Sequence, residues 1–177
     1  MIDRKLYEII KEILGESSLK KYPEEFSTRV IIQKILYLLT HGASSPKINL
    51  SYNWNFYLYG PYSPEIAQMI YHMNDVWEEI SNKVVELDRF ELKCIEHFKE
   101  FKKDLNRIQE KDRDLSKLTD SELFEVLATL VYFAGHISEN EGKIQEKFST
   151  FKPELCKKMS KESFNQIFSL LSKYAYI

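Results

Sequence analysis

The chain is poor in cysteine and glycine, and it lacks any long apolar run. Its two cysteines, Cys94 and Cys156, cannot form a disulfide framework. Five glycines leave little room for a phosphate-binding loop, and neither a G-x-S-x-G nor an H-E-x-x-H motif occurs. The most apolar stretch, residues 30–39, is interrupted by Gln33 and Lys34, whereas a membrane-spanning helix needs about 20 apolar residues. We therefore expect a soluble protein that does not enter the membrane.

These absences also bear on compartment and activity. The first residues are charged from position 3 onward and do not resemble a secretory leader, which together with the scarce cysteine predicts a cytoplasmic protein. No motif indicates a reaction or a cofactor, so we predict a protein that is not an enzyme and binds no cofactor. A catalytic pairing of a cysteine with a distant histidine stays open as an alternative.

Positive charge is scarce in the form that phosphate recognition favours. Lysine outnumbers arginine 20 to 5, although the planar guanidinium group suits phosphates and bases better. The formal net charge is −2, so the field of the whole molecule favours neither polyanions nor polycations. Residues 48–82 contain no lysine or arginine at all. Nucleic acid is therefore a disfavoured partner.

What the chain does contain is apolar residues at helical spacing. With 177 residues, 44% of them hydrophobic, it can bury a sizeable core as one domain, residues 1–177. The fold class that we predict is mainly α, with six or seven helices and a minor β element of one or two strands. Submodules are expected at roughly 1–88 and 89–177, and the helix–strand–helix order of the first is compatible with a winged-helix relative.

Capping residues and glycines place the expected helix ends. Ser27, Ser63, Thr119 and Ser160 are the predicted N-caps, and glycines 15, 42 and 135 the predicted ends. Residues 16–26 are predicted to be a connector and residues 109–118 a polar link. The expected helices cover about 2–14, 28–41, 64–77, 89–108, 120–134, 140–151 and 161–173.

Between residues 48 and 58 the apolar period changes to two, which predicts a half-buried strand. Gly60-Pro61 ends that strand, and Ser63-Pro64-Glu65 begins the next helix with a cap, a first-turn proline and an acid at the positive helix end. Residues 83–88 (KVVELD) are a candidate second strand. The residues expected to face inward are Ile48, Leu50, Tyr52, Trp54, Phe56 and Leu58.

Four segments carry a family resemblance: IIQKILYLL (31–39), FYLYGPYSPEI (56–66), LATLVYF (127–133) and KFSTFKPEL (147–155). In this order they resemble a small family of uncharacterised prokaryotic YwgA-like proteins. That family is similar in turn to the SocA-like (Panacea) antitoxin domain, whose members carry a K-x-x-Y-L helix followed by a tyrosine-glycine-proline turn. The positions that match are Lys34, Tyr37, Leu38, Tyr59, Gly60, Pro61 and Tyr62.

The resemblance implies a mainly helical domain with a small β element. For Panacea members it further implies an antitoxin or adaptor role through binding of a partner protein. Ser63-Pro64-Glu65 departs from the Panacea pattern and is closer to the YwgA-like one.

A winged-helix DNA-binding regulator is the main alternative, with residues 64–77 as its recognition helix. Such a helix needs cations and amides aimed at phosphates and bases. Its predicted exposed face instead carries four carboxylates and no ammonium, which would repel DNA. The cations between residues 99 and 111 alternate with acids and favour a solvated face. The predicted exposed residues of the helix are Glu65, Gln68, His72, Asp75, Glu78 and Glu79.

A metal site has one candidate set, Glu91, Cys94 and His97, spaced along a single helix face. No second Cys/His pair occurs, and Cys94 fits an apolar helix face. We therefore predict no metal site.

The remaining candidate is the aromatic turn. If Leu58 faces inward, then Tyr57 and Tyr59 face outward, and outward tyrosines suit a protein interface, where a good aromatic anchor contributes about 2 kcal/mol or more. A free strand edge could also accept a partner strand. A purely structural turn is the competing interpretation. We predict a non-catalytic regulatory module that docks a partner protein through Tyr57, Tyr59, Gly60, Pro61, Tyr62, Ser63 and Glu65.

Overall fold

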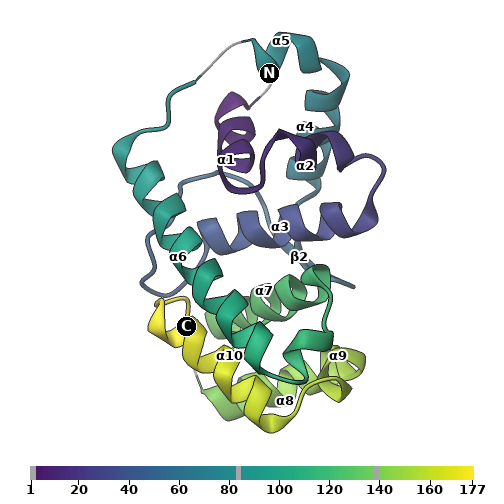
Figure 1. Cartoon of the computed structure of the whole chain (residues 1–177), viewed down its shortest axis with the longest axis vertical. Helices are drawn as coiled ribbons and strands as arrows, with labels where there is room; N and C mark the ends of the chain where they lie inside the picture. The colour runs from purple at the N-terminus through teal and green to yellow at the C-terminus, as the bar shows by residue number, and fades with distance from the viewer. Residues whose placement is uncertain (1–2, 83–84, 138–139) are drawn as a thin grey trace.

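The computed structural model describes residues 3–82, 85–137 and 140–177. Within these ranges the chain forms ten α-helices, one 3-10 helix and a two-stranded antiparallel sheet, which confirms the mainly α fold class (Figure 1). The elements in chain order are α1 (Arg4–Leu14), α2 (Glu16–Lys21), α3 (Phe26–Thr40), β1 (Asn55–Tyr57), β2 (Gly60–Tyr62), α4 (Pro64–Asp75), α5 (Trp77–Ser81), α6 (Arg89–Lys111), η1 (Leu115–Lys117), α7 (Asp120–His136), α8 (Glu141–Phe151), α9 (Pro153–Lys157) and α10 (Lys161–Lys173).

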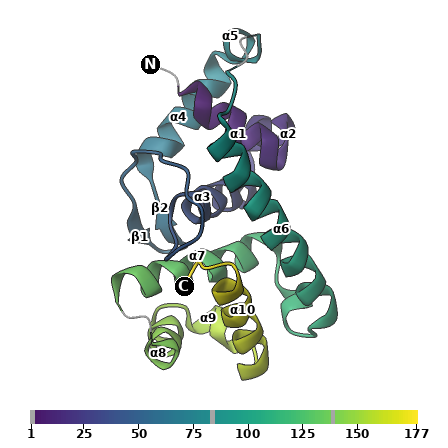
Figure 2. The same ribbon diagram turned by 90° about the vertical axis from the view of Figure 1, so that its left-hand side faces the viewer.

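Helices α3 and α7 form the centre of the fold and pack against each other. Both are apolar around most of their circumference, and such helices are buried on more than one side. The helices α1, α2 and α4 lie beyond α3, the helices α8 to α10 lie beyond α7, and the long helix α6 runs past both groups (Figures 1 and 2). One hydrophobic core therefore joins residues from both predicted submodules. None of the described helices combines the length and apolarity needed to cross a bilayer.

Several helices begin where capping residues predict. The hydroxyl oxygens of Ser63, Thr119 and Ser160 each accept a hydrogen bond from the backbone N–H three residues further on. The Glu122 carboxylate in turn accepts the N–H of Thr119 at 3.0 Å, which completes the predicted capping box. Local sequence thus sets the starts of α4, α7 and α10.

Other expected boundaries are wrong. Helix α3 begins at Phe26, because Glu25 takes the N-cap position, and Ser27 lies inside the helix. The predicted connector contains α2, and α7 runs through Gly135 to His136. A glycine inside a helix costs only about 1 kcal/mol, which packing of the apolar α7 overrides. The short helices α2, α5 and α9 raise the number above the expected six or seven.

The β element is a hairpin, shorter than predicted. Only Asn55–Tyr57 of the expected strand 48–58 is paired, although the predicted alternation of burial holds from Ile48 to Phe56. The partner strand is β2, which pairs in antiparallel register with Tyr57 opposite Gly60. The expected strand 83–88 is wrong: residues 85–88 carry no regular structure, and 83–84 lie outside the described residues.

A two-residue turn, Leu58-Tyr59, joins the strands of the hairpin. Gly60 follows the turn with a φ of +85°, a conformation in which glycine alone avoids strain. Leu58 and Tyr59 themselves have negative φ, because Ala175 is the only described non-glycine residue with positive φ. The turn therefore depends on glycine at position 60.

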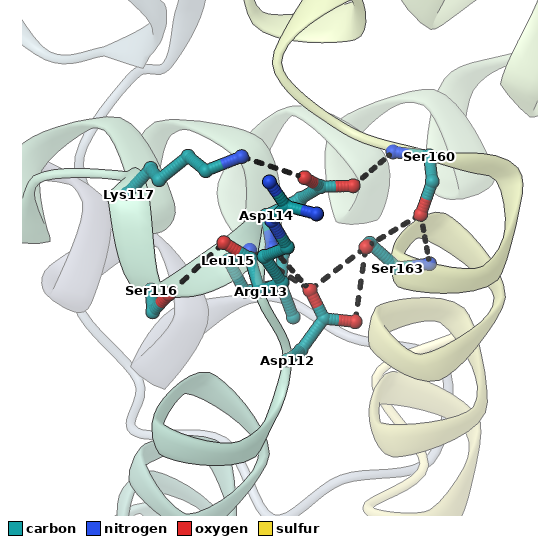
Figure 3. Close-up of polar contacts among 8 residues, drawn as sticks. All are labelled: Asp112, Arg113, Asp114, Leu115, Ser116, Lys117, Ser160 and Ser163. Carbon is teal, nitrogen blue, oxygen red and sulfur yellow. Dashed lines mark hydrogen bonds and ion pairs between the residues drawn. The ribbon is translucent and has the colours of Figure 1, made fainter.

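The polar link after α6 is organised by Asp112. Its carboxylate accepts from the N–H groups of Asp114 and Leu115 and from the hydroxyl of Ser163, each at 2.9 Å. The carboxylate of Asp114 accepts the N–H of Ser160 at 3.2 Å. Figure 3 shows these groups facing one another between the two segments. The network fixes the start of α10 against the end of α6.

Candidate functional site

The hairpin lies beside α3 and above α7 in Figure 2. Side chains of α3 form hydrogen bonds to its backbone. The Lys34 ammonium donates to the carbonyl oxygen of Pro61 at 2.7 Å. The Gln33 amide donates to the carbonyl of Ser63 at 3.1 Å and accepts its N–H at 3.0 Å. The lysine and the proline of the sequence motif are thus in direct contact, and together with Gln33 they fix where the hairpin ends.

Lys152, just before α9, holds the turn from the other side. Its ammonium donates to the carbonyl oxygen of Leu58 and to the Glu125 carboxylate, the latter at 2.6 Å. Both charged side chains are less than a tenth exposed, so this is a buried ion pair in which each charge depends on the other. The ammonium also lies 5.5 Å from the centre of the Phe56 ring. The hairpin is therefore clamped between two buried lysines.

Lys34 differs from Lys152 because no carboxylate contacts it. It is 2% exposed, and the ion pairs among the described residues do not include it. Burial lowers the pKa of its ammonium to about 7; the charge of Glu125 opposes this shift and that of Lys152 adds to it. Lys34 is thus a buried cation whose charge is costly to maintain.

Three of the predicted docking residues support the turn from within. Gly60, Pro61 and Ser63 are buried. A β-carbon at Gly60 would lie 2.8 Å from the hydroxyl oxygen of Thr129 and 3.6 Å from the Cε of Lys34. These three positions therefore set the geometry of the hairpin.

The turn itself faces solvent. Tyr57 and Tyr59 are 49% and 43% exposed, as predicted, and Tyr62 is half-buried with its ring edge-on to Tyr57 at 5.4 Å. The expectation that Leu58 faces inward is wrong, because this side chain is 78% exposed. The chain reverses at Leu58-Tyr59, so the alternation of sides along the strand ends there.

Glu65, the last predicted docking residue, is exposed and already bonded. Its two carboxylate oxygens accept the backbone N–H of Asn53 at 3.1 Å and the side-chain amide of Asn53 at 2.9 Å. These bonds lower the pKa of Glu65. They tie the segment before β1 to the first turn of α4.

Two hollows flank the turn. We call the first, of about 380 Å³ between α3, the hairpin and α4, the tyrosine pocket. The second, of about 570 Å³, lies toward α7 and the segment 151–155 and is called the α7 hollow. Phe26, Val30, Leu58 and Tyr59 line both, and we call the two adjoining hollows together the groove. The tyrosine pocket is lined by Tyr22, Tyr57, Tyr59, Tyr62 and Tyr71, together with Arg29, Lys34 and the apolar residues that both hollows share.

Positive charge does reach this region in space, although residues 48–82 carry none in sequence. Arg29, Lys34 and Lys152 come from α3 and from the segment before α9. Both lysines are directed at hairpin carbonyls. On α4 and α5, by contrast, every residue of the expected recognition face is exposed and four of the six are acidic. We therefore find no reason in that face to favour DNA.

The candidate metal ligands are engaged elsewhere. Glu91 closes the capping box of α6 and pairs with Lys5, and the His97 ring bonds to the carbonyl of Tyr174 at 3.1 Å. Cys94 is buried, which raises the pKa of its thiol. No group of three or more metal-binding side chains occurs within residues 3–82, 85–137 and 140–177.

Sequence reasoning found the exposed tyrosines but missed what supports them. No distinguishing local pattern marked Phe26, Arg29 or Glu125, because their roles arise from contacts between distant segments. Lys152 lies in the segment 147–155 of the resemblance but was not singled out there. Lys34 was marked by the sequence as the lysine of the K-x-x-Y-L motif. The motif did not indicate that this lysine contacts the carbonyl of Pro61.

Comparison with family models, with curated proteins and with solved structures finds no match. The YwgA-like and Panacea-like resemblance stays a prediction, and the functional argument depends on the geometry of the hairpin.

Proposed function

We propose that the protein is a non-catalytic docking module, and that a segment of a partner protein binds in the groove across the Leu58-Tyr59 turn. The observation that carries this proposal is the exposure of the Leu58 side chain. This side chain stands at the tip of a hairpin, 78% exposed, between two hollows. A fully buried leucine is stabilised by about 1.5–3 kcal/mol relative to an exposed one, and here that gain is left unused.

The hairpin is held rigidly enough to serve as a docking surface. Lys34, Lys152 and Gln33 fix the backbone on either side of the turn. The apolar surface continues past Leu58 onto Tyr59 and Phe26, whose rings meet edge-to-face at 4.9 Å. Rigid aromatic side chains lose little conformational freedom on binding, and for that reason they dominate many interfaces.

Paired alanine variants test the proposal. Leu58→Ala/Tyr59→Ala removes two large exposed side chains from the turn. Phe90→Ala/Leu92→Ala removes two exposed apolar side chains from α6 and is the matched control. Both proteins are tagged, compared by thermal unfolding and used for pull-down from the native host, with retained proteins identified by mass spectrometry.

We expect both variants to unfold within a few degrees of the parent chain, because exposed side chains contribute little to stability. The control should retain the proteins that the parent retains, and the Leu58/Tyr59 variant should lose a specific one. A photo-crosslinking residue at position 58 should then join that protein, whereas one at position 92 should not. Retention of every partner by the folded Leu58/Tyr59 variant would refute docking at the turn.

A further inference from the structure

We infer that the tyrosine pocket binds a carboxylate carried next to an aromatic ring, supplied by the docked partner segment as an acidic residue beside an aromatic one. This inference rests on the proposed docking function. It specifies which chemical group of the partner segment enters the tyrosine pocket.

No carboxylate of the described residues contacts the positive charge that lines the tyrosine pocket; the nearby Glu125, whose charge acts on Lys34, is paired with Lys152. Arg29 donates to the main-chain carbonyls of Tyr22 and Pro23, at 3.3 and 3.0 Å, and Lys34 donates to that of Pro61. Among the described residues that line the pocket, none is an aspartate or a glutamate. A cation held away from water is costly unless an anion pairs with it. A carboxylate entering the pocket would therefore pair with the Arg29 guanidinium and favour the charged form of Lys34.

The α7 hollow at the other end of the groove is different. It is lined by three glutamates, and each already has a lysine partner. Because its charges are paired, this hollow has no comparable demand for an ion of either sign. The preference for an anion is therefore specific to the tyrosine pocket. The three pairs are Glu122–Lys158, Glu125–Lys152 and Glu154–Lys157.

The walls of the tyrosine pocket suit an aromatic ring. Edge-to-face contacts such as those between its side chains leave ring faces and edges available to a further ring. A volume of about 380 Å³ also lies within the range of about 300–1,000 Å³ that is usual for pockets of small organic groups. The ring pairs are Tyr22–Tyr71 at 5.3 Å, Phe26–Tyr59 at 4.9 Å and Tyr57–Tyr62 at 5.4 Å.

Proton uptake gives an independent readout. Burial lowers the pKa of Lys34 to about 7, and a bound carboxylate would raise it, because an opposite charge favours the ammonium form. Binding at pH 8 should then take up a proton, and affinity should fall as the pH rises above about 7. The titratable groups around Lys34 are Glu125 on α7, Lys152 before α9, Arg29 on α3, and Tyr22, Tyr57, Tyr59, Tyr62 and Tyr71.

Three probes that share one ring test the inference: 4-hydroxyphenylacetate, its neutral amide 4-hydroxyphenylacetamide, and the cation tyramine. Calorimetric titration of the full chain at pH 7 should show the acid binding about ten-fold tighter than the amide, a difference of about 1.4 kcal/mol. Tyramine should bind most weakly. Titration of the acid at pH 8 in two buffers of different ionisation enthalpy should reveal the proton taken up.

Variants assign the effect to residues. Lys34→Met should narrow the difference in affinity between the acid and the amide and abolish the proton uptake, and Arg29→Gln, which should also narrow that difference, serves if the first variant does not fold. Lys20→Met is the control, because Lys20 lies over the Trp77 ring and outside the pocket. It should leave the affinity for the acid unchanged.

Each outcome bears on a separate claim. Equal binding of acid and amide would overturn the anion preference, yet docking at Leu58 and Tyr59 could still be demonstrated by pull-down. Absence of binding by all three probes at millimolar concentration would overturn the pocket as a binding site. Tight binding of the acid, combined with a Leu58→Ala/Tyr59→Ala variant that keeps every partner, would show that the pocket takes a free acid and not a partner segment.

Discussion

The hairpin and the link at Asp112 are both held by polar side chains from distant segments, but their hydrogen bonds are distributed differently. In the link, the Asp112 carboxylate accepts from backbone N–H groups and from Ser163, and Lys117 pairs with Asp114 (Figure 3). The same carboxylate also accepts from the Gln166 amide. Donors and acceptors match within the network. Beneath the hairpin, Lys34 reaches one carbonyl and no acid, while Leu58 and its neighbouring rings remain uncovered.

The difference separates two uses of polar residues. A network whose groups satisfy one another stabilises one arrangement of the chain and has little capacity left for a ligand. A buried ammonium that no carboxylate contacts can still bind an anion beside the exposed rings, but burying its charge lowers the stability of the fold. Changes in the link should therefore alter stability alone, whereas changes around the hairpin should affect stability, binding or pH dependence according to the residue chosen.

The largest effect is expected at Glu125, which supports the hairpin. Glu125→Ala leaves the Lys152 ammonium buried without a carboxylate, and loss of one partner from a buried pair costs about 3–5 kcal/mol. Urea denaturation should show a correspondingly lower midpoint with an unchanged slope.

Two comparisons identify the cause of that loss. The double variant Glu125→Leu/Lys152→Met removes both charges and should recover most of the stability, because apolar replacements of a buried pair are often neutral. Glu154→Ala, which breaks the exposed pair with Lys157, should cause no measurable change. A Glu125→Ala protein as stable as the parent would show that Lys152 does not depend on this carboxylate.

An intermediate effect is expected at Asp112 in the link. Asp112→Ala removes the acceptor for two backbone N–H groups and for the side chains of Ser163 and Gln166. Loss of a cap alone costs about 1 kcal/mol, so we expect about 1–2 kcal/mol from equilibrium unfolding. Pull-down of the partner by the folded variant should be unchanged, and its loss would contradict the division between the two regions.

The features of these regions that the sequence could predict are local. The caps at Ser63 and Thr119 were predictable, because a cap is recognised within four residues. The alternation from Ile48 to Phe56 was also predictable, because it is read directly from neighbouring residues. The prediction that Leu58 faces inward was wrong because it extended the strand alternation into the turn. The alternation of apolar and polar residues does not indicate where a two-residue turn begins.

The supporting contacts were beyond local reasoning. Lys34 and Pro61 are 27 positions apart, as are Glu125 and Lys152, and only the packing of the hairpin on α3 and α7 brings them together. The absence of cations between residues 48 and 82 was a true feature of the sequence. It was a poor guide to the charge near the turn, because Arg29, Lys34 and Lys152 arrive from other segments.

The effect most specific to the hairpin concerns the pH dependence of stability. Lys34 has a pKa of about 7 in the folded chain, against an ordinary value of 10.5. Between these values the unfolded chain binds more protons than the folded chain, so the free energy of unfolding should rise with pH. For one proton the slope is at most about 1.4 kcal/mol per pH unit. Urea denaturation from pH 7 to 9.5 should show this rise, and Lys34→Met should abolish it.

The window ends at pH 9.5 because buried tyrosines act in the opposite direction at higher pH. Burial raises the pKa of Tyr22 to about 12, so its ionisation in the unfolded chain destabilises the fold above pH 10. Lys20→Met, which removes a cation outside the pocket, should keep the slope of the parent. A parent chain with the same pH dependence as Lys34→Met over this range would mean that Lys34 stays protonated in the fold. The buried ammonium would then have a counter-charge, and the tyrosine pocket would have no unmet demand for an anion.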